Sequence, residues 1–121
     1  MARVDISQWA KKAELSLEEA ARGITLKLFS SVIMDTRVDT GRMRGNWQAS
    51  IGSPRANETD SKDPAGQSTV QQMSATVRSG TLNIMTNNVP YAPYWEQHDG
   101  MIAKNMARIN RIVREEVAKA K

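Results

Sequence analysis

The chain has 121 residues, the length of one ordinary domain with a modest hydrophobic core. It contains no cysteine, so disulfides, thiolate zinc sites and cysteine nucleophiles are excluded, and no run approaches the roughly 20 apolar residues of a membrane span or the apolar core of a secretory signal. The net charge of +4 belongs to one segment, because residues 101–121 carry six basic and two acidic residues while the rest is balanced. We expect a soluble protein made in the cytoplasm, without contact with a membrane.

The first predicted element, within residues 1–36, is a long amphipathic helix. Its apolar residues recur at spacings of three or four, which is the period of one helix face. They are Ile6, Trp9, Ala13, Leu17, Ala20, Ile24 and Leu28. A second stripe of Leu26, Phe29 and Ile33 widens the apolar arc, so we expect the later half to be more deeply buried. Gly23 is expected to bend the helix, at a cost of about 1 kcal/mol relative to alanine.

Residues 37–52 are predicted to form a turn followed by a strand. Asp39, Thr40 and Gly41 have the chemistry of a tight turn, in which Gly41 takes a positive φ. The glycines do not have the spacing of a phosphate-binding loop, which also opens a helix. After the turn, apolar and polar residues alternate, as in a strand with one buried face. The apolar positions are Trp47, Ala49 and Ile51.

Residues 53–68 are almost free of apolar side chains and are predicted to be an exposed loop. We expect residues 53–66 to be flexible in an isolated subunit and to become ordered on assembly. Asp63 and Pro64 predict a helix start, as N-cap and first helical residue. That short helix would reach about Val77 and bury Val70, Met73 and Val77.

The second strand is predicted over residues 81–86, with Leu82 and Ile84 on its buried face, and a turn over residues 87–90 ends it. The next stretch, YAPYWEQHDG, is interpreted as an irregular segment whose aromatic residues pack onto the core. The last predicted helix covers residues 101–120. Its apolar stripe is Ile102, Met106, Ile109, Val113, Val117 and Ala120, and its opposite stripe is Lys104, Arg108, Arg111, Glu115 and Lys119.

These elements predict a single α+β domain over residues 1–121. A small antiparallel β-sheet would pack against the long N-terminal helix and the C-terminal helix, with the long polar loop at the surface.

The sequence gives no support for an enzyme or for a cofactor. His98 has Glu96 and Asp99 nearby, but adjacent loop residues seldom converge on one metal ion, so a solvated loop histidine is the favoured interpretation. No serine has a nucleophile-elbow pattern around it, and no pair of carboxylates is indicated. Two nonenzymatic classes stay open, an assembly component and a small basic nucleic-acid-binding protein. The second rests on the basic stripe and on Arg37, Arg42 and Arg44, without a recognised DNA-binding motif.

Two segments carry a resemblance to a known family. VDTGRMRGNWQASIG at 38–52 and TNNVPYAPYWE at 86–96, separated by a polar loop containing DPAGQST, resemble the tailed-bacteriophage neck and tail-completion family of the lambda-like minor tail protein Z type. The order of features is similar over nearly the whole chain: a long helix, the first segment, the loop and helix start, the second segment and a C-terminal helix.

The resemblance implies a structural virion protein at the head–tail junction, which completes the tail and lets genomic DNA pass through a central channel. It implies a closed homo-oligomeric ring, for which six subunits are expected, beside connector and tail proteins, with non-specific DNA contact in the channel. The residues implied as the structural motif are Asp39, Thr40, Gly41, Gly45, Asn46, Trp47, Asn87, Asn88, Pro90, Tyr91 and Glu96. The residues expected to be free for a neighbouring subunit or for DNA are Arg42, Arg44, Lys104, Arg108, Arg111 and Lys119. Whether the basic stripe faces the channel or an adjoining ring stays open, with the second slightly favoured.

Overall fold

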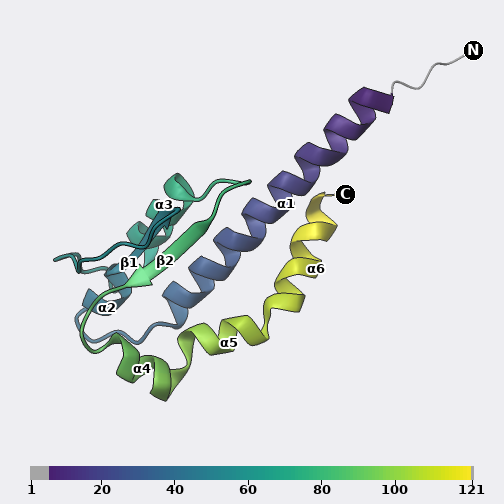
Figure 1. The fold of residues 1–121 in the computed structure, drawn as a ribbon. Coiled ribbons are helices and arrows are strands. Elements are labelled where there is room, and N and C mark those ends of the chain that lie inside the picture. The colour runs from purple at the N-terminus through teal and green to yellow at the C-terminus, as the bar shows by residue number, and fades with distance from the viewer. Residues whose placement is uncertain (1–5, 121) are drawn as a thin grey trace, which may run out of the picture.

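The structure, a computed structural model, describes the backbone of residues 6–120 and the side chains of residues 17–118. The fold is α+β, as predicted, with helices at both ends and a two-stranded antiparallel sheet between them (Figure 1). The elements are α1 (Ile6–Asp35), α2 (Arg42–Gly45), β1 (Trp47–Ile51), α3 (Gln67–Thr76), β2 (Asn83–Asn87), α4 (Ala92–Asp99), α5 (Met101–Ala107) and α6 (Ile109–Ala120). Within the described residues, no helix has the length and apolarity needed to cross a membrane.

The long helix α1 is the element on which the others pack. Its 30 residues extend over about 45 Å, and α3, α5 and α6 all contact it. Figure 1 shows α3 and the sheet on one side of α1 and α6 running back along the other side. The later half is the more deeply buried, as predicted, since Val32 and Ile33 are buried whereas Leu17 is exposed. The predicted positions Ile6, Trp9 and Ala13 lie outside the described side chains.

Gly23 lies on the side of α1 that faces α6. A Cβ atom at this position would lie 2.5 Å from the carboxylate at the end of the Glu116 side chain on α6, which would have to move aside. One turn further along, Lys27 of α1 pairs with Glu115 of α6. Helix α1 runs without a break over Ile6–Asp35, and Figure 1 shows no sharp bend along it. The bend expected at Gly23 is therefore not seen.

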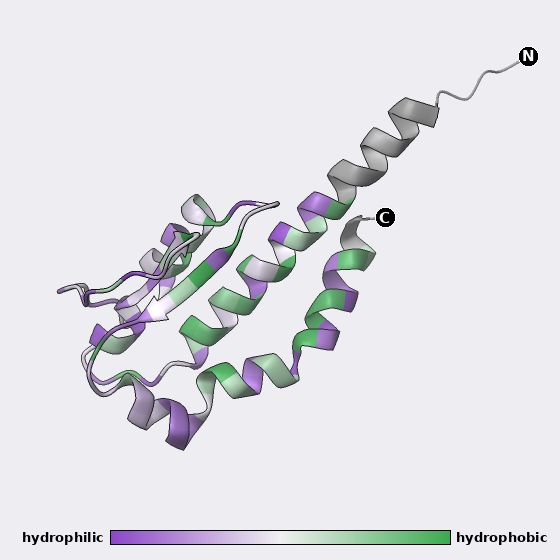
Figure 2. Cartoon of the chain, in the orientation of Figure 1, coloured by the Kyte–Doolittle hydropathy of each residue, from purple (hydrophilic) through white to green (hydrophobic). Residues whose placement is uncertain are grey.

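The hydrophobic core lies where the second half of α1 meets the sheet, α3 and the start of α5. The buried members of this cluster are Val32, Ile33, Met43, Trp47, Met73, Val89, Ala92 and Met101. Figure 2 shows hydrophobic positions along the second half of α1 and along β2. On α3, Met73 is fully buried and Val70 packs against the cluster, in agreement with the predicted apolar face of that helix.

The sheet differs from the prediction in which residues it buries. Ala49 lies opposite Met85 in the antiparallel register, and both pack against the core. Leu82 precedes β2 and is 66% exposed, and Ile51 at the end of β1 is 44% exposed, so both were wrongly assigned to the buried face. Ile84 is only half-buried and lies on the opposite face of β2 from Met85. The prediction for β2 was therefore one residue out of phase. The face of β2 that packs toward the core contains Met85 between two polar residues, Asn83 and Asn87, so the apolar pattern did not reveal it.

The C-terminal segment is not the single helix that was predicted. It breaks at Arg108 into α5 and α6, and the aromatic stretch before it forms helix α4 where an irregular segment was expected. At the break, the carboxylate of Asp35 accepts hydrogen bonds from Asn105 at 2.9 Å and from Arg108 at 3.0 Å. These contacts tie the break to the end of α1. As a result Met101, Asn105 and Ile112 are buried, while the predicted core residues Ile102 and Met106 are exposed.

Asp63 caps α3, although the helix begins later than predicted. Its carboxylate accepts hydrogen bonds from the backbone N–H groups of Gly66 at 3.2 Å and Thr69 at 2.7 Å, and from the Thr69 hydroxyl at 2.8 Å. Pro64 lies in the turn before the helix rather than at its first position. Burial alone would raise the pKa of Asp63, but the hydrogen bonds from Thr69 and Gly66 outweigh burial and lower this pKa below its usual value.

Replacing Asp63 with alanine should lower the free energy of unfolding by about 1 kcal/mol near pH 7, because α3 loses its cap. A lowered carboxylate pKa stabilises the fold above the unfolded value of about 4, and this stabilisation is lost as the pH falls through the folded value. The difference between wild type and Asp63→Ala in urea unfolding should therefore shrink in acid. Asp60→Ala, which removes an exposed neighbouring carboxylate without a hydrogen bond, should have almost no effect. A difference that stays constant down to about pH 2 would contradict this role.

Candidate functional site

The two motif segments, 38–52 and 86–96, meet in the structure. Trp47 and Asn87 are paired across the sheet, and the Asn87 side chain donates a hydrogen bond of 2.6 Å to the carbonyl of Met43. The indole N–H of Trp47 donates to the Thr36 hydroxyl at 2.8 Å, which fixes the buried ring at the end of α1. The segments therefore form one corner between α1, the sheet and α4.

The glycines of the first segment are required by close backbone contact. Gly41 has φ of 85°, as the turn chemistry predicted, and a Cβ there would lie 2.5 Å from the Pro64 nitrogen. Its carbonyl accepts a hydrogen bond of 2.9 Å from the N–H of Asp63. A Cβ at Gly45 would lie 2.9 Å from the same nitrogen of Asp63. Both glycines thus allow the end of the polar loop to lie directly on the corner.

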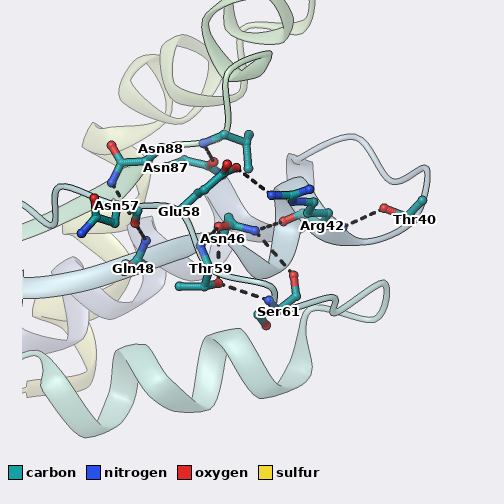
Figure 3. A network of polar contacts seen from close by, with 11 residues as sticks. Thr40, Arg42, Asn46, Gln48, Asn57, Glu58, Thr59, Ser61, Asn87 and Asn88 are labelled. Carbon is teal, nitrogen blue, oxygen red and sulfur yellow. Dashed lines mark hydrogen bonds and ion pairs between the residues drawn. The ribbon is translucent and has the colours of Figure 1, made fainter.

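Amide side chains of the motifs hold the polar loop over the outer face of the sheet (Figure 3). Asn46 accepts a hydrogen bond of 2.6 Å from the N–H of Thr59 and donates one of 2.7 Å to the carbonyl of Arg42. Two further amides reach loop carbonyls: Gln48 donates to Asn57 at 2.7 Å, and Asn88 donates to Arg55 at 2.8 Å. The loop is exposed, as predicted, but its backbone is bound at several points.

The two arginines of the first segment were expected to be free, but both have partners within the chain. Arg44 donates to the carbonyl oxygens of Pro64 at 2.6 Å, Met34 at 2.8 Å and Thr36 at 2.9 Å. One guanidinium thereby joins the end of α1 to the end of the loop. Arg42 pairs with Glu58 of the loop at 2.9 Å, with both side chains more than a third exposed. The prediction of free arginines was wrong for two reasons. The turn that reverses the chain leaves carbonyl groups that need donors, which Arg44 supplies, and the polar loop brings the Glu58 carboxylate beside Arg42.

Glu96 of the second segment caps the helix that follows. Its carboxylate accepts hydrogen bonds from the N–H groups of Ile102 at 2.9 Å and Ala103 at 3.1 Å, at the start of α5. A negative charge at this end of a helix is also favoured by the helix dipole. The glutamate therefore has a structural role in setting the direction of α5 after Gly100.

An ion pair stacked on an aromatic ring joins the corner to α4. The Arg37 guanidinium lies 3.9 Å from the Trp95 ring centre and donates to Asp99 at 2.9 and 3.0 Å. This pairing raises the pKa of Arg37 and lowers the pKa of Asp99, chiefly through the hydrogen bonds between them. His98 is an exposed residue of α4, 4.7 Å from Tyr94 between ring centres, so its predicted place on a loop was wrong. Among the residues with described side chains, no three histidine or carboxylate groups cluster as a metal site.

A pocket of about 450 Å³ opens between the two motif segments. Its lining residues are Arg37, Asp39, Thr40, Arg42, Met43, Lys62, Tyr91 and Trp95. The walls combine aromatic rings with cationic groups, and they contain no nucleophile beside a general base. Such a lining suits a segment of another protein better than a small substrate, because aromatic and arginine side chains are the usual anchors of protein interfaces. Tyr91 is 40% exposed and is the large aromatic side chain of the motif that such a partner could contact.

The basic stripe of the C-terminal segment is interrupted. Lys104 is exposed, whereas Arg108 lies at the helix break and pairs with Asp35. Arg111 is exposed and lies 3.8 Å from Glu115 on the same helix. The side chain of Lys119 lies outside the described residues. Arg108 therefore already has a carboxylate partner on α1, and Lys104 and Arg111 are the described members of the stripe whose side chains form no ion pair with another element.

Comparison of the chain with protein-family models, with curated proteins and with solved structures finds no match. The interpretation of this corner therefore depends on the two motif segments and on their geometry.

Exchanging Arg44 for methionine should lower the free energy of unfolding by roughly 2–3 kcal/mol, because three carbonyl groups lose a charged donor. Arg42→Met is the matched control in the same segment. It removes the same charge but only a solvent-screened ion pair, and should cost less than about 1 kcal/mol. Urea unfolding of both variants tests the difference. Equal losses would show that Arg44 does not hold the corner.

Proposed function

We propose that this protein is a structural virion component of the head–tail junction of a tailed bacteriophage. In this role it is one subunit of a closed ring that completes the tail, and the genome passes through the centre of that ring. It is made in the host cytoplasm and works in the virion, beside connector and tail proteins. The proposal rests on the resemblance of the two motif segments to the tail-completion family.

One observation supports the proposal more than the others: the two motif segments, far apart in the chain, form a single corner. Their polar residues act as turn formers, helix caps and loop anchors, a use that fits an assembly protein whose surface must keep a fixed shape. Glu96, Asn46 and Asn88 all bind backbone groups within the chain. A motif that served catalysis would instead direct such groups toward a substrate.

The surface offers contacts for neighbours. Tyr94, Ile102 and Met106 are large apolar side chains with 54%, 42% and 53% exposure, and all lie on α4 and α5. Exposed large apolar side chains that gather into a patch mark protein interfaces. We place the accessible cations Lys104 and Arg111 toward an adjoining ring, because a strongly attractive channel wall would retard DNA that must leave quickly.

Reversing two charges should separate assembly from folding. Lys104→Glu combined with Arg111→Glu should reduce the joining of heads to tails in infected cells, with filled heads and free tails accumulating in electron micrographs. Arg78→Glu, a charge reversal on an exposed residue outside α4, α5 and α6, is the control and should assemble normally. Arg108 is left intact because its reversal would break the contact with Asp35.

One outcome would contradict the proposed placement of these cations, and another would contradict the proposed function. Particles of the Lys104 and Arg111 variant that assemble normally but retain or eject DNA abnormally would place these cations in the channel. Salt-sensitive DNA binding by the free wild-type protein, with no ring in native mass spectrometry or electron micrographs, would favour a small nucleic-acid-binding protein instead.

A further inference from the structure

The free edge of β2 carries unpaired backbone groups. In an antiparallel pair, opposed residues alternate between those that exchange hydrogen bonds and those whose N–H and C=O groups point away from each other. Gly52 donates to the Leu82 carbonyl at 3.0 Å, and this pair continues the register of the strands. The phase of the alternation is thereby fixed. The pairs Ser50–Ile84 and Gln48–Thr86 exchange hydrogen bonds, while Asn83, Met85 and Asn87 direct their backbone groups outward.

The composition of β2 is unusual for an edge that stays in water. Proteins commonly protect such edges with lysine, proline or a bulge. The strand, NIMTN, contains no charged residue and no proline, in a chain of which 25% is charged. Leu82, just before the strand, is 66% exposed. No hydrogen bond joins the outward backbone groups of β2 to another described residue.

The free edge of β1 lies in a groove. A cavity of about 410 Å³ touches both Gln48 and Ala49, which are consecutive residues on opposite faces of β1. A space that reaches both faces of a strand must lie at its edge, and β2 occupies the other edge. The groove is walled by the polar loop through Arg55, Thr59 and Ser61, and by α3 through Gln72, Ala75 and Thr76. By the same phase, Trp47, Ala49 and Ile51 direct their backbone groups away from β2, and Ala49 is the one of the three that lines the cavity.

We propose that the β2 edge of one copy enters the β1 groove of the next copy, so that the two-stranded sheets join into one continuous sheet around the ring. The occupant is a second copy because this chain itself supplies both halves of the contact, a bare strand edge and a groove beside a strand edge. Addition of a strand satisfies the free backbone groups of both edges at once. This inference rests on the proposed ring.

The geometry is self-consistent with cyclic symmetry. Rotation about a ring axis keeps the sense of each strand along that axis, so every β1 has the same sense and every β2 the opposite one. Pairing of β2 with the next β1 is therefore antiparallel, like the pairing within the subunit. The contact joins two different surfaces, which generates a ring when the rotation closes. The polar loop forms one wall of the groove, so the motif amides that anchor it also shape the contact.

Amide hydrogen exchange measured by NMR tests the proposal. In the dilute subunit, the amides of Ile84 and Thr86 should be protected and those of Asn83, Met85 and Asn87 should exchange fast. In the assembled ring, exchanged as a ring and then dissociated for measurement, the amides of these three residues and of Ala49 should slow by about tenfold or more. A ring in which these amides stay fast would overturn the strand pairing and leave the proposed function standing. Absence of a ring at any concentration would overturn both.

Cross-linking identifies the two partners in the contact, since the chain has no cysteine of its own. Chains with Thr86→Cys on β2 are mixed with chains carrying Gln48→Cys on β1, after circular dichroism has shown that both fold. Oxidation, or a short bis-maleimide, should link the mixture and leave each chain alone largely unlinked. Efficient linking of Thr86→Cys chains by themselves would indicate a two-fold β2–β2 contact and contradict head-to-tail pairing.

Discussion

The structure depends most on how the chain turns at the end of α1, and Thr36 is the residue that organises this turn. Its buried hydroxyl donates to the Val32 carbonyl at 2.7 Å and accepts the Trp47 indole N–H at 2.8 Å, while its carbonyl accepts from Arg44 at 2.9 Å. Of these three hydrogen bonds, one anchors the side chain to α1, one holds the first residue of β1 and one holds α2. The two bonds of the hydroxyl are buried, where an unmade hydrogen bond is costly. The position of the tryptophan, and with it the register of the sheet on α1, follows from this turn.

A small domain with a two-stranded sheet has few ladder bonds, so side chains must satisfy much of its backbone. This explains the polar motifs in physical terms. Asn46 and Asp63 each bind two or more groups of the neighbouring backbone, and Glu96 binds the start of α5. These residues serve as substitutes for secondary structure. The loop that they hold lies over the sheet without contributing apolar residues to the core, so its attachment is polar throughout and close to water.

The sequence predicted what depends on strong periodic signals and failed where tertiary contacts decided. The long helix, the antiparallel strand pair, the turn at Gly41 and the buried face of α3 follow from spacing and turn chemistry. The break at Arg108 was not predictable from the pattern, because the apolar stripe continues through it and Asp35, which stabilises the break, is 73 residues away. The roles of Arg42 and Arg44 were missed for the same reason. A sequence identifies a cation, but only the fold shows which carbonyl or carboxylate it meets.

The partners that the fold gives to the cations change which features of this chain are expected to serve assembly. Its positive charge looks like the natural means of contact, yet Lys27, Arg37 and Arg108 each pair with a carboxylate of another element, and such exposed pairs are each worth about 0–1 kcal/mol at most. Charge that already has an internal partner adds little to binding of a neighbour, since the internal contact must be lost first. Among the described residues, none competes for the outward backbone groups of the sheet edges, so only water does. In the proposed contact, directional pairing of these groups would also fix the angle between subunits, which flexible lysine and arginine side chains cannot do, and a constant angle is what closes a ring.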